Sequence, residues 1–121
     1  MEATQQQPML SESVTIGSTK ITIRPLSETD HAALFPLLSQ LTSAPQIPYD
    51  KYVELLHRQQ QSDDHYVFVA LRDQVLIGTA SLFLMHKFIR GAGICAFVED
   101  VVVDKSVRGL HIGRTLITKL V

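Results

Sequence analysis

FVEDVVVDKSVRGLHIGRTLITKLV, residues 97–121, combines three features that decide the fold: a β-prone run, a glycine-bearing loop and the beginning of a helix. The run contains Phe97, Val98 and Val101–Val103, and this apolar composition predicts a strand that is buried on both faces. Apolar residues recur at helical spacing after Gly113, which predicts a helix there. A strand that leads through a short loop into a helix indicates an α/β architecture.

Two adjacent carboxylates, Glu99 and Asp100, interrupt this apolar run. Burying an unpaired carboxylate is costly, so the strand must open onto a polar site there or lie beside basic partners. Neighbours on a regular strand point to opposite faces, so both carboxylates can serve one substrate only where a β-bulge redirects one of them. A structural ion pair with Lys87, Arg90 or Arg108 is the alternative.

The loop from Arg108 to Gly113 has the composition of a phosphate cradle. A glycine-bearing loop that leads into a helix exposes unpaired backbone N–H groups at the positive end of the helix dipole. Gly109 and Gly113 allow close backbone approach to an anion, and Arg108 and Arg114 add fork-shaped donors. An ordinary strand-to-helix turn is the alternative. A nucleotide P-loop is disfavoured, because the glycine spacing is one residue short and Arg114 replaces the required lysine.

The segment Val98–Val103, followed by Arg108-Gly109-x-x-x-Gly113, resembles the acetyl-coenzyme A motif of the GNAT acetyltransferases. Leu41–Thr42 and His86–Ile89 further resemble the glucosamine-6-phosphate N-acetyltransferases within that superfamily. The resemblance implies the GNAT acyl-CoA N-acyltransferase fold, with a mixed, mostly antiparallel sheet flanked by helices. It also implies direct acetyl transfer from acetyl-CoA to the amine of glucosamine 6-phosphate, a step toward UDP-N-acetylglucosamine.

The resemblance assigns roles to particular residues. It implies that Glu99 and Asp100 are catalytic and also bind the substrate. Further substrate-binding residues would be Thr42, Lys87, Phe88, Ile89 and Arg90. Cofactor-binding residues would be Val101, Val102, Val103, Arg108, Gly109, Leu110, His111, Ile112, Gly113 and Arg114. No metal is implied, and the five histidines show no close metal-ligand spacing.

Two other functions stay open at this point. One is a GNAT enzyme with a different amine acceptor, and the other is a non-catalytic module that binds CoA and dimerises. The sequence ends at Val121 within an apolar helix pattern and without a C-cap, so we expect the C-terminal strands of the fold to be missing. The family resemblance implies a homodimer.

Length, net charge and cysteine content limit the number of domains, the classes of partner and the cellular compartment. A chain of 121 residues fits one domain, expected over residues 16–121, after a polar arm without regular structure over residues 1–15. A net charge of −1 argues against a nucleic-acid partner, and no apolar run is long enough to suggest a membrane partner. The one cysteine, Cys95, fits a reducing compartment. We therefore expect a cytoplasmic protein, with organellar import left open.

The rest of the chain predicts a strand, two helices and a hairpin. Alternation of apolar and polar residues over Lys20–Pro25 predicts the strand. Ser27 is a residue type that is favoured as a helix N-cap, so we expect the first helix to begin there. Pro48 suits the beginning of the second helix. Expected core positions in the two helices are Leu34, Leu37, Leu38, Leu41, Tyr49, Tyr52, Val53 and Leu56. Strands on either side of Asp73–Gln74 predict an antiparallel hairpin, and a loop is expected over Arg90–Gly93.

Overall fold

A computed structural model describes residues 12–16, 19–107 and 113–114. Five strands form one antiparallel sheet in the order β1-β2-β3-β4-β5. The strands are β1 (Glu12–Ile16), β2 (Thr19–Pro25), β3 (His65–Arg72), β4 (Val75–His86) and β5 (Ile94–Val103). The helices are η1 (Glu28–Asp30), α1 (His31–Leu38), α2 (Tyr49–Gln60), α3 (Ile89–Ala92) and η2 (Lys105–Val107). The predicted α/β class is confirmed.

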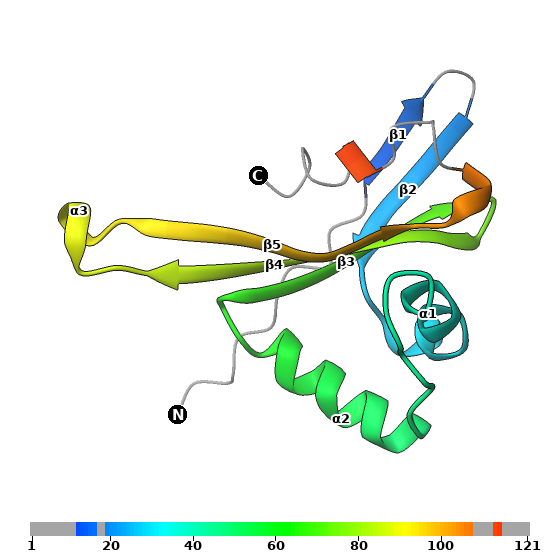
Figure 1. Cartoon of the computed structure of the whole chain (residues 1–121), viewed down its shortest axis with the longest axis horizontal. Coiled ribbons are helices and arrows are strands. Elements are labelled where there is room, and N and C mark those ends of the chain that lie inside the picture. The colour runs from blue at the N-terminus through cyan, green and yellow to red at the C-terminus, as the bar shows by residue number, and fades with distance from the viewer. Residues whose placement is uncertain (1–11, 17–18, 108–112, 115–121) are drawn as a thin grey trace.

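Each face of the sheet carries its own apolar cluster. Helices α1 and α2 cover one face, as Figure 1 shows, and their buried residues pack with Val69 and Leu71 of β3. On the other face, Ile21 and Ile23 of β2 pack with Val107 of η2. Burial of both faces fixes the register of the central strands, because a one-residue slip would exchange the two clusters.

Strand β2 confirms the predicted alternation, since Ile21 and Ile23 are buried and Lys20 is exposed. The expectation of an unstructured arm over residues 1–15 is corrected at its end. Residues Glu12–Ile16 form strand β1, which pairs antiparallel with β2. The physical reason is the otherwise open edge of β2, which β-prone residues of the N-terminal segment cover with a ladder of hydrogen bonds.

The hairpin between β3 and β4 turns at Asp73 and Gln74, as predicted. Both residues have positive φ angles, 50° and 66°, which is the backbone of a two-residue turn that matches the twist of the strands. Near this turn, Ala70 pairs with Gly78 and Leu71 with Leu76, so the ladder skips one residue of β4. The register of this hairpin is therefore set by its turn and one irregularity.

The prediction that β5 is buried on both faces is wrong. Only Val102 is buried, while Phe97 is 39% exposed and Glu99 and Asp100 are exposed. In the described chain β5 pairs with β4 alone, so it forms one edge of the sheet. An apolar run does not reveal how many neighbours its strand has.

Two helix positions expected in the core are also corrected, because Leu41 is 47% and Tyr49 is 51% exposed. Leu41 follows the end of α1, so the helical spacing no longer applies to it. Tyr49 is the first residue of α2, and its hydroxyl group donates a 3.2 Å hydrogen bond to Glu28 instead of entering the core.

A buried ion pair ties β2 to the beginning of α1. Asp30, 5% exposed, accepts two 2.8 Å hydrogen bonds from the guanidinium group of Arg24. It also accepts a 2.8 Å bond from the backbone N–H of Ser27. Burial of Asp30 opposes its charged form, but the hydrogen bonds from Arg24 and Ser27 outweigh that effect and lower its pKa.

The β4–β5 ribbon extends beyond the rest of the sheet as an arm with α3 at its tip (Figure 1). The expected loop over Arg90–Gly93 is instead mostly the turn α3, whose residues Arg90, Gly91 and Ala92 all have positive φ angles. The backbone N–H of Lys87 donates to the carbonyl of Gly93 at 2.8 Å and closes the tip.

None of the helices that the structure describes has the length and apolarity that a membrane crossing requires. Within the same residues, no group of three histidine, cysteine or acidic side chains is placed to hold a metal ion.

Candidate active site

The ladder between β4 and β5 contains one inserted residue at the predicted carboxylates. Glu99 pairs with Ser81, after which Asp100 and Val101 together oppose Ala80. This is the two-against-one count of a β-bulge. The structure thus contains the bulge that would be needed to redirect one carboxylate.

Asp100 carries the conformational signature of the bulge, with a φ angle of 50°. Aspartate tolerates this left-handed region better than most residues that are not glycine. The side chains of Glu99 and Asp100 are both exposed, and neither forms an ion pair with Lys87 or Arg90 in the described part of the chain. Two ionisable groups are therefore presented at the bulge.

The bulge also changes the backbone beside these carboxylates. An inserted residue leaves its peptide groups outside the regular ladder, and Val101–Val103 continue the strand along the edge of the described sheet. An edge strand offers N–H and C=O groups to an extended ligand. The predicted cofactor residues Val101, Val102 and Val103 therefore lie on the edge strand of the described sheet, and their pairing with an extended ligand stays a prediction.

The predicted phosphate loop is only partly described. Arg108, Gly109, Leu110, His111 and Ile112 lie outside the described residues, and their predicted role stays a prediction. Gly113 and Arg114 have helical backbone, and a Cβ atom on Gly113 would lie 3.5 Å from a methyl group of Val103. The end of the loop therefore returns to the strand that carries the bulge.

Thr42 lies in the exposed turn that follows α1. Its backbone N–H donates a 3.1 Å hydrogen bond to the carbonyl of Leu38, the last residue of that helix. Helix α1 contacts both β4 and β5. Thr42 is therefore fixed to an element that packs against the two strands of the bulge.

Three of the predicted sugar-phosphate residues line one cavity of about 340 Å³ at the tip of the arm. Lys87, Ile89 and Arg90 lie around it with Gly93, Ile94 and Cys95. Two cationic side chains beside one cavity suit an anion such as a phosphate. Phe88 does not line it and is fully exposed, at 104%.

The arm tip lies away from the carboxylates within one copy of the chain. Ser81, which pairs with Glu99, is five residues from His86, the end of β4. Lys87 is the next residue, and at about 3.4 Å per residue it lies roughly 20 Å along the ribbon from the pair of Ser81 and Glu99. One copy of the described chain therefore does not bring Lys87 and Arg90 together with Glu99 and Asp100.

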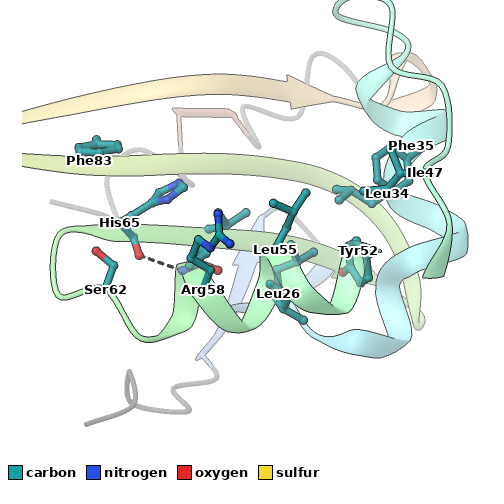
Figure 2. A pocket seen from close by; sticks show the side chains of 13 residues that line it. Leu26, Leu34, Phe35, Ile47, Tyr52, Leu55, Arg58, Ser62, His65 and Phe83 are labelled. Carbon is teal, nitrogen blue, oxygen red and sulfur yellow. Dashed lines mark hydrogen bonds between the residues drawn. The ribbon is translucent and has the colours of Figure 1, made fainter. Parts of the chain in front are cut away.

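A larger cavity of about 530 Å³ lies between α2, the middle of α1 and the sheet (Figure 2). Its lining is mostly apolar, with Tyr52 toward one end and Ser62, His65 and Phe83 toward the other. None of the predicted site residues lines it. A strongly polar sugar phosphate does not match such a lining, so we do not assign the acceptor to this cavity.

Sequence reasoning missed two residues beside the predicted site, Gln40 and Asp104. Gln40 lies two positions before Thr42, and Asp104 directly follows β5, the strand that contains Val101–Val103. Their side chains form a 2.6 Å hydrogen bond although 64 residues separate them. No local pattern predicts such a contact, and only their closeness to motif residues could have drawn attention to them.

Comparison with known sequences identifies the relatives of this chain. A model of the Acetyltransferase (GNAT) family matches residues 31–121. The probable glucosamine 6-phosphate N-acetyltransferase 2 of Oryza sativa subsp. japonica is 33% identical, over 100% of this chain and 76% of the rice protein. The probable glucosamine 6-phosphate N-acetyltransferase of Drosophila melanogaster is also 33% identical, over 84% of this chain and 48% of the fly protein.

Solved structures agree with the sequence relatives. Glucosamine-6-phosphate N-acetyltransferase from Arabidopsis thaliana has a TM-score of 0.78 and 28% identity, over 83% of this chain and 71% of that chain. An aminoglycoside N-acetyltransferase in complex with CoA has a TM-score of 0.63 and 25% identity, over 94% and 70%. The fold and the family match define the class as GNAT acetyltransferase. Within that class, the chain belongs to the glucosamine 6-phosphate N-acetyltransferase family.

Proposed function

We propose that this chain transfers the acetyl group of acetyl-CoA to the amine of D-glucosamine 6-phosphate. The product, N-acetylglucosamine 6-phosphate, would enter UDP-N-acetylglucosamine synthesis. The observation that carries the proposal is the bulge at Asp100, which presents two carboxylates within β5, the edge strand of the described sheet. Membership of a family named for this reaction supports it.

Acetyl-CoA is the co-substrate in this proposal. Its pantetheine arm pairs with the backbone of Val101–Val103 as an added strand, and its pyrophosphate sits on the loop from Arg108 to Arg114. The CoA complex of a neighbour with the same fold supports the choice of cofactor. The transfer needs no metal, because an amine attacks a thioester once it is deprotonated and the carbonyl is polarised.

The carboxylates act on the acceptor amine. The amine must be neutral to attack, so Glu99 or Asp100 accepts its proton, directly or through water. A new C–N bond forms at the acetyl carbonyl, the C–S bond breaks, and CoA leaves as the thiolate. A backbone N–H of the bulged strand stabilises the negative charge on the carbonyl oxygen during attack. No acyl-enzyme forms.

The sugar phosphate contacts come from two regions, Thr42 and the arm tip. Because Lys87, where the tip begins, lies roughly 20 Å along the ribbon from Glu99, the tip of one copy serves the bulge of a second copy in a homodimer. Apolar side chains at the tip support this arrangement, since Phe88, Ile89 and Ile94 are 104%, 64% and 60% exposed. The cytoplasm is the proposed location.

Thermal unfolding with and without acetyl-CoA tests the cofactor part of the proposal. At a hundredfold excess over the dissociation constant, a ligand of the folded state adds about 2.7 kcal/mol to stability. We expect a clear rise in midpoint. A cooperative transition that acetyl-CoA does not move would contradict cofactor binding.

A panel of amine acceptors tests the substrate. We expect acetylation of glucosamine 6-phosphate and much slower reaction with glucosamine, which lacks the phosphate. Preference for another amine would support the alternative acceptor. Binding of acetyl-CoA without transfer to any amine would support the non-catalytic, dimerising module.

A further inference from the structure

Gln40 bridges two parts of the site that are far apart in the sequence. Its side-chain amide donates a 2.6 Å hydrogen bond to Oδ1 of Asp104, which directly follows β5. Its side-chain carbonyl accepts a 3.0 Å hydrogen bond from the backbone N–H of Lys105. Both ends of the amide group are used, so the orientation of the Gln40 side chain is defined.

The partner of Gln40 is itself firmly held. The backbone N–H of Asp104 donates a 2.7 Å hydrogen bond to the carbonyl of Ile77 in β4. Its second carboxylate oxygen accepts a 3.0 Å bond from the N–H of Ser106 and another from the hydroxyl of Ser106. Hydrogen bonds from Ser106 and Gln40 lower the pKa of Asp104 to about 2, so the bond from Gln40 is charge-assisted at neutral pH.

Gln40 itself lies in the same turn as Thr42, one of the predicted substrate-binding residues. Gln40 and Thr42 share the turn that ends α1, where their backbone N–H groups donate to the carbonyls of Leu37 and Leu38. Lys105 begins η2, the short helix that ends at Val107, one residue before the predicted phosphate loop. The side-chain amide of Gln40 therefore joins the turn of Thr42 to η2, the segment that leads into the predicted phosphate loop.

We propose that Gln40 is a positioning residue, which fixes the turn of Thr42 relative to η2, the segment directly before the predicted phosphate loop, through Asp104 and Lys105. The inference rests on the proposed function, because that function places the acceptor at Thr42 and acetyl-CoA at the loop. Gln40 touches neither reactant in this proposal. Its effect comes from alignment, to which acetyl transfer is sensitive because the amine must approach the thioester closely.

Exchanging the two polar groups gives a direct test. Gln40→Glu keeps the acceptor for the N–H of Lys105 but sets a second carboxylate against Asp104. The double variant Gln40→Glu/Asp104→Asn places a donor at position 104 and restores the hydrogen bond with its direction reversed. Gln60→Glu is the matched control. The side-chain amide of Gln60, at the end of α2, donates a 3.1 Å hydrogen bond to the backbone carbonyl of Leu26, away from Thr42 and η2. Gln40→Met, which removes both bonds without adding charge, gives a second measurement if the charged variant fails to fold.

The dissociation constant for acetyl-CoA and the thermal midpoint are measured for each variant. We expect Gln40→Glu to raise the dissociation constant roughly tenfold, and the double variant to return it to within about threefold of the parent, as coupled neighbours do. Gln60→Glu should lower the midpoint at least as much as Gln40→Glu while leaving the dissociation constant unchanged. An unchanged constant in Gln40→Glu and Gln40→Met, or no recovery in the double variant, would overturn the inference.

The acceptor assay separates this test from that of the proposed function. If the parent chain binds acetyl-CoA but does not acetylate glucosamine 6-phosphate, the proposed function is wrong. The binding data still decide the role of Gln40 in that case. If the parent is active, Gln40→Glu should also lower kcat, and the double variant should restore it.

Discussion

Asp100 stands opposite Ala80 as the inserted residue of the β4–β5 ladder, with a φ angle of 50°. Asp100 holds the left-handed backbone of the bulge, and under the proposed function its carboxylate is one of the two candidate bases. Glu99 precedes it in the regular part of the ladder. The bulge therefore allows the charge and the geometry of the site to be altered independently.

Removing either carboxylate should reduce turnover. We expect Glu99→Gln or Asp100→Asn to lower kcat by about 10²–10⁴-fold, whichever residue is the base, because a positioned base contributes that much. The dissociation constant for acetyl-CoA should stay unchanged. Steady-state kinetics and calorimetry make the comparison, with Glu54→Gln on the exposed face of α2 as control. Full turnover in both variants would exclude the assignment.

Changing the backbone preference at position 100 should change stability instead. Asp100→Val places a β-branched residue at positive φ and should cost about 1–2 kcal/mol. Asp100→Gly also lacks the carboxylate but favours this conformation, so its free energy of unfolding should equal or exceed that of the parent. Chemical denaturation measures both. Equal stability of the two variants would mean that the bulge relaxes on substitution.

Gly113→Ala should separate cofactor binding from folding. The added methyl group meets only an ordinary 3.5 Å contact with Val103, so the thermal midpoint should not fall. The same methyl group would obstruct a phosphate on the loop, and we expect roughly tenfold weaker acetyl-CoA binding, or about 1.4 kcal/mol. Unchanged affinity would indicate that the pyrophosphate lies elsewhere.

Asp30→Ala should destabilise the fold by about 3 kcal/mol, because it leaves Arg24 without its buried partner. The pKa of Asp30 is lowered on folding, so its contribution is complete above the ordinary value of 3.8. That contribution is lost as the pH falls below 3.8 toward the folded value. Urea unfolding across this range should show a weaker dependence on pH in the variant. Asp63→Ala, at an exposed position, should behave like the parent.

Gln74→Gly should stabilise the protein by about 1 kcal/mol, since Gln74 has a φ angle of 66° in the β3–β4 turn. The control is Gln61→Gly at the end of α2, where φ is −87° and glycine brings no conformational relief. Denaturation midpoints compare the two. A loss of stability in Gln74→Gly would show that the glutamine side chain makes a contact that outweighs the strain.

Local patterns in the sequence predicted much of the fold. Alternation at Ile21 and Ile23, the turn at Asp73–Gln74 and the need for a bulge near Asp100 all follow from rules that act over a few residues. The exposure of β5 could not be predicted in this way. It depends on which strands lie beside Val101–Val103, and the residue types of a strand do not show which other strands pair with it.

The candidate site was predictable as residue types but not as an arrangement. The resemblance assigned Glu99 and Lys87 to one site, yet the register of the arm sets them apart in one copy of the chain. The bridge between Gln40 and Asp104 had no sequence signal, because side-chain contacts across 64 residues depend on the packing of α1 against the sheet.

The arm described above has a consequence for amide hydrogen exchange. β3 pairs with β4 only as far as Phe83. Beyond it Leu84–His86 pair with β5, and the backbone N–H of Leu84 donates one further 2.8 Å hydrogen bond to the carbonyl of Asp64. A two-stranded ribbon is marginally stable by itself, so we expect protection factors to fall steadily from Thr79 toward His86. The cations of the tip would then sit on the most readily opened part of the ladder. Binding of an anion or a second copy at Lys87 and Arg90 should be visible as slower exchange along the whole ribbon.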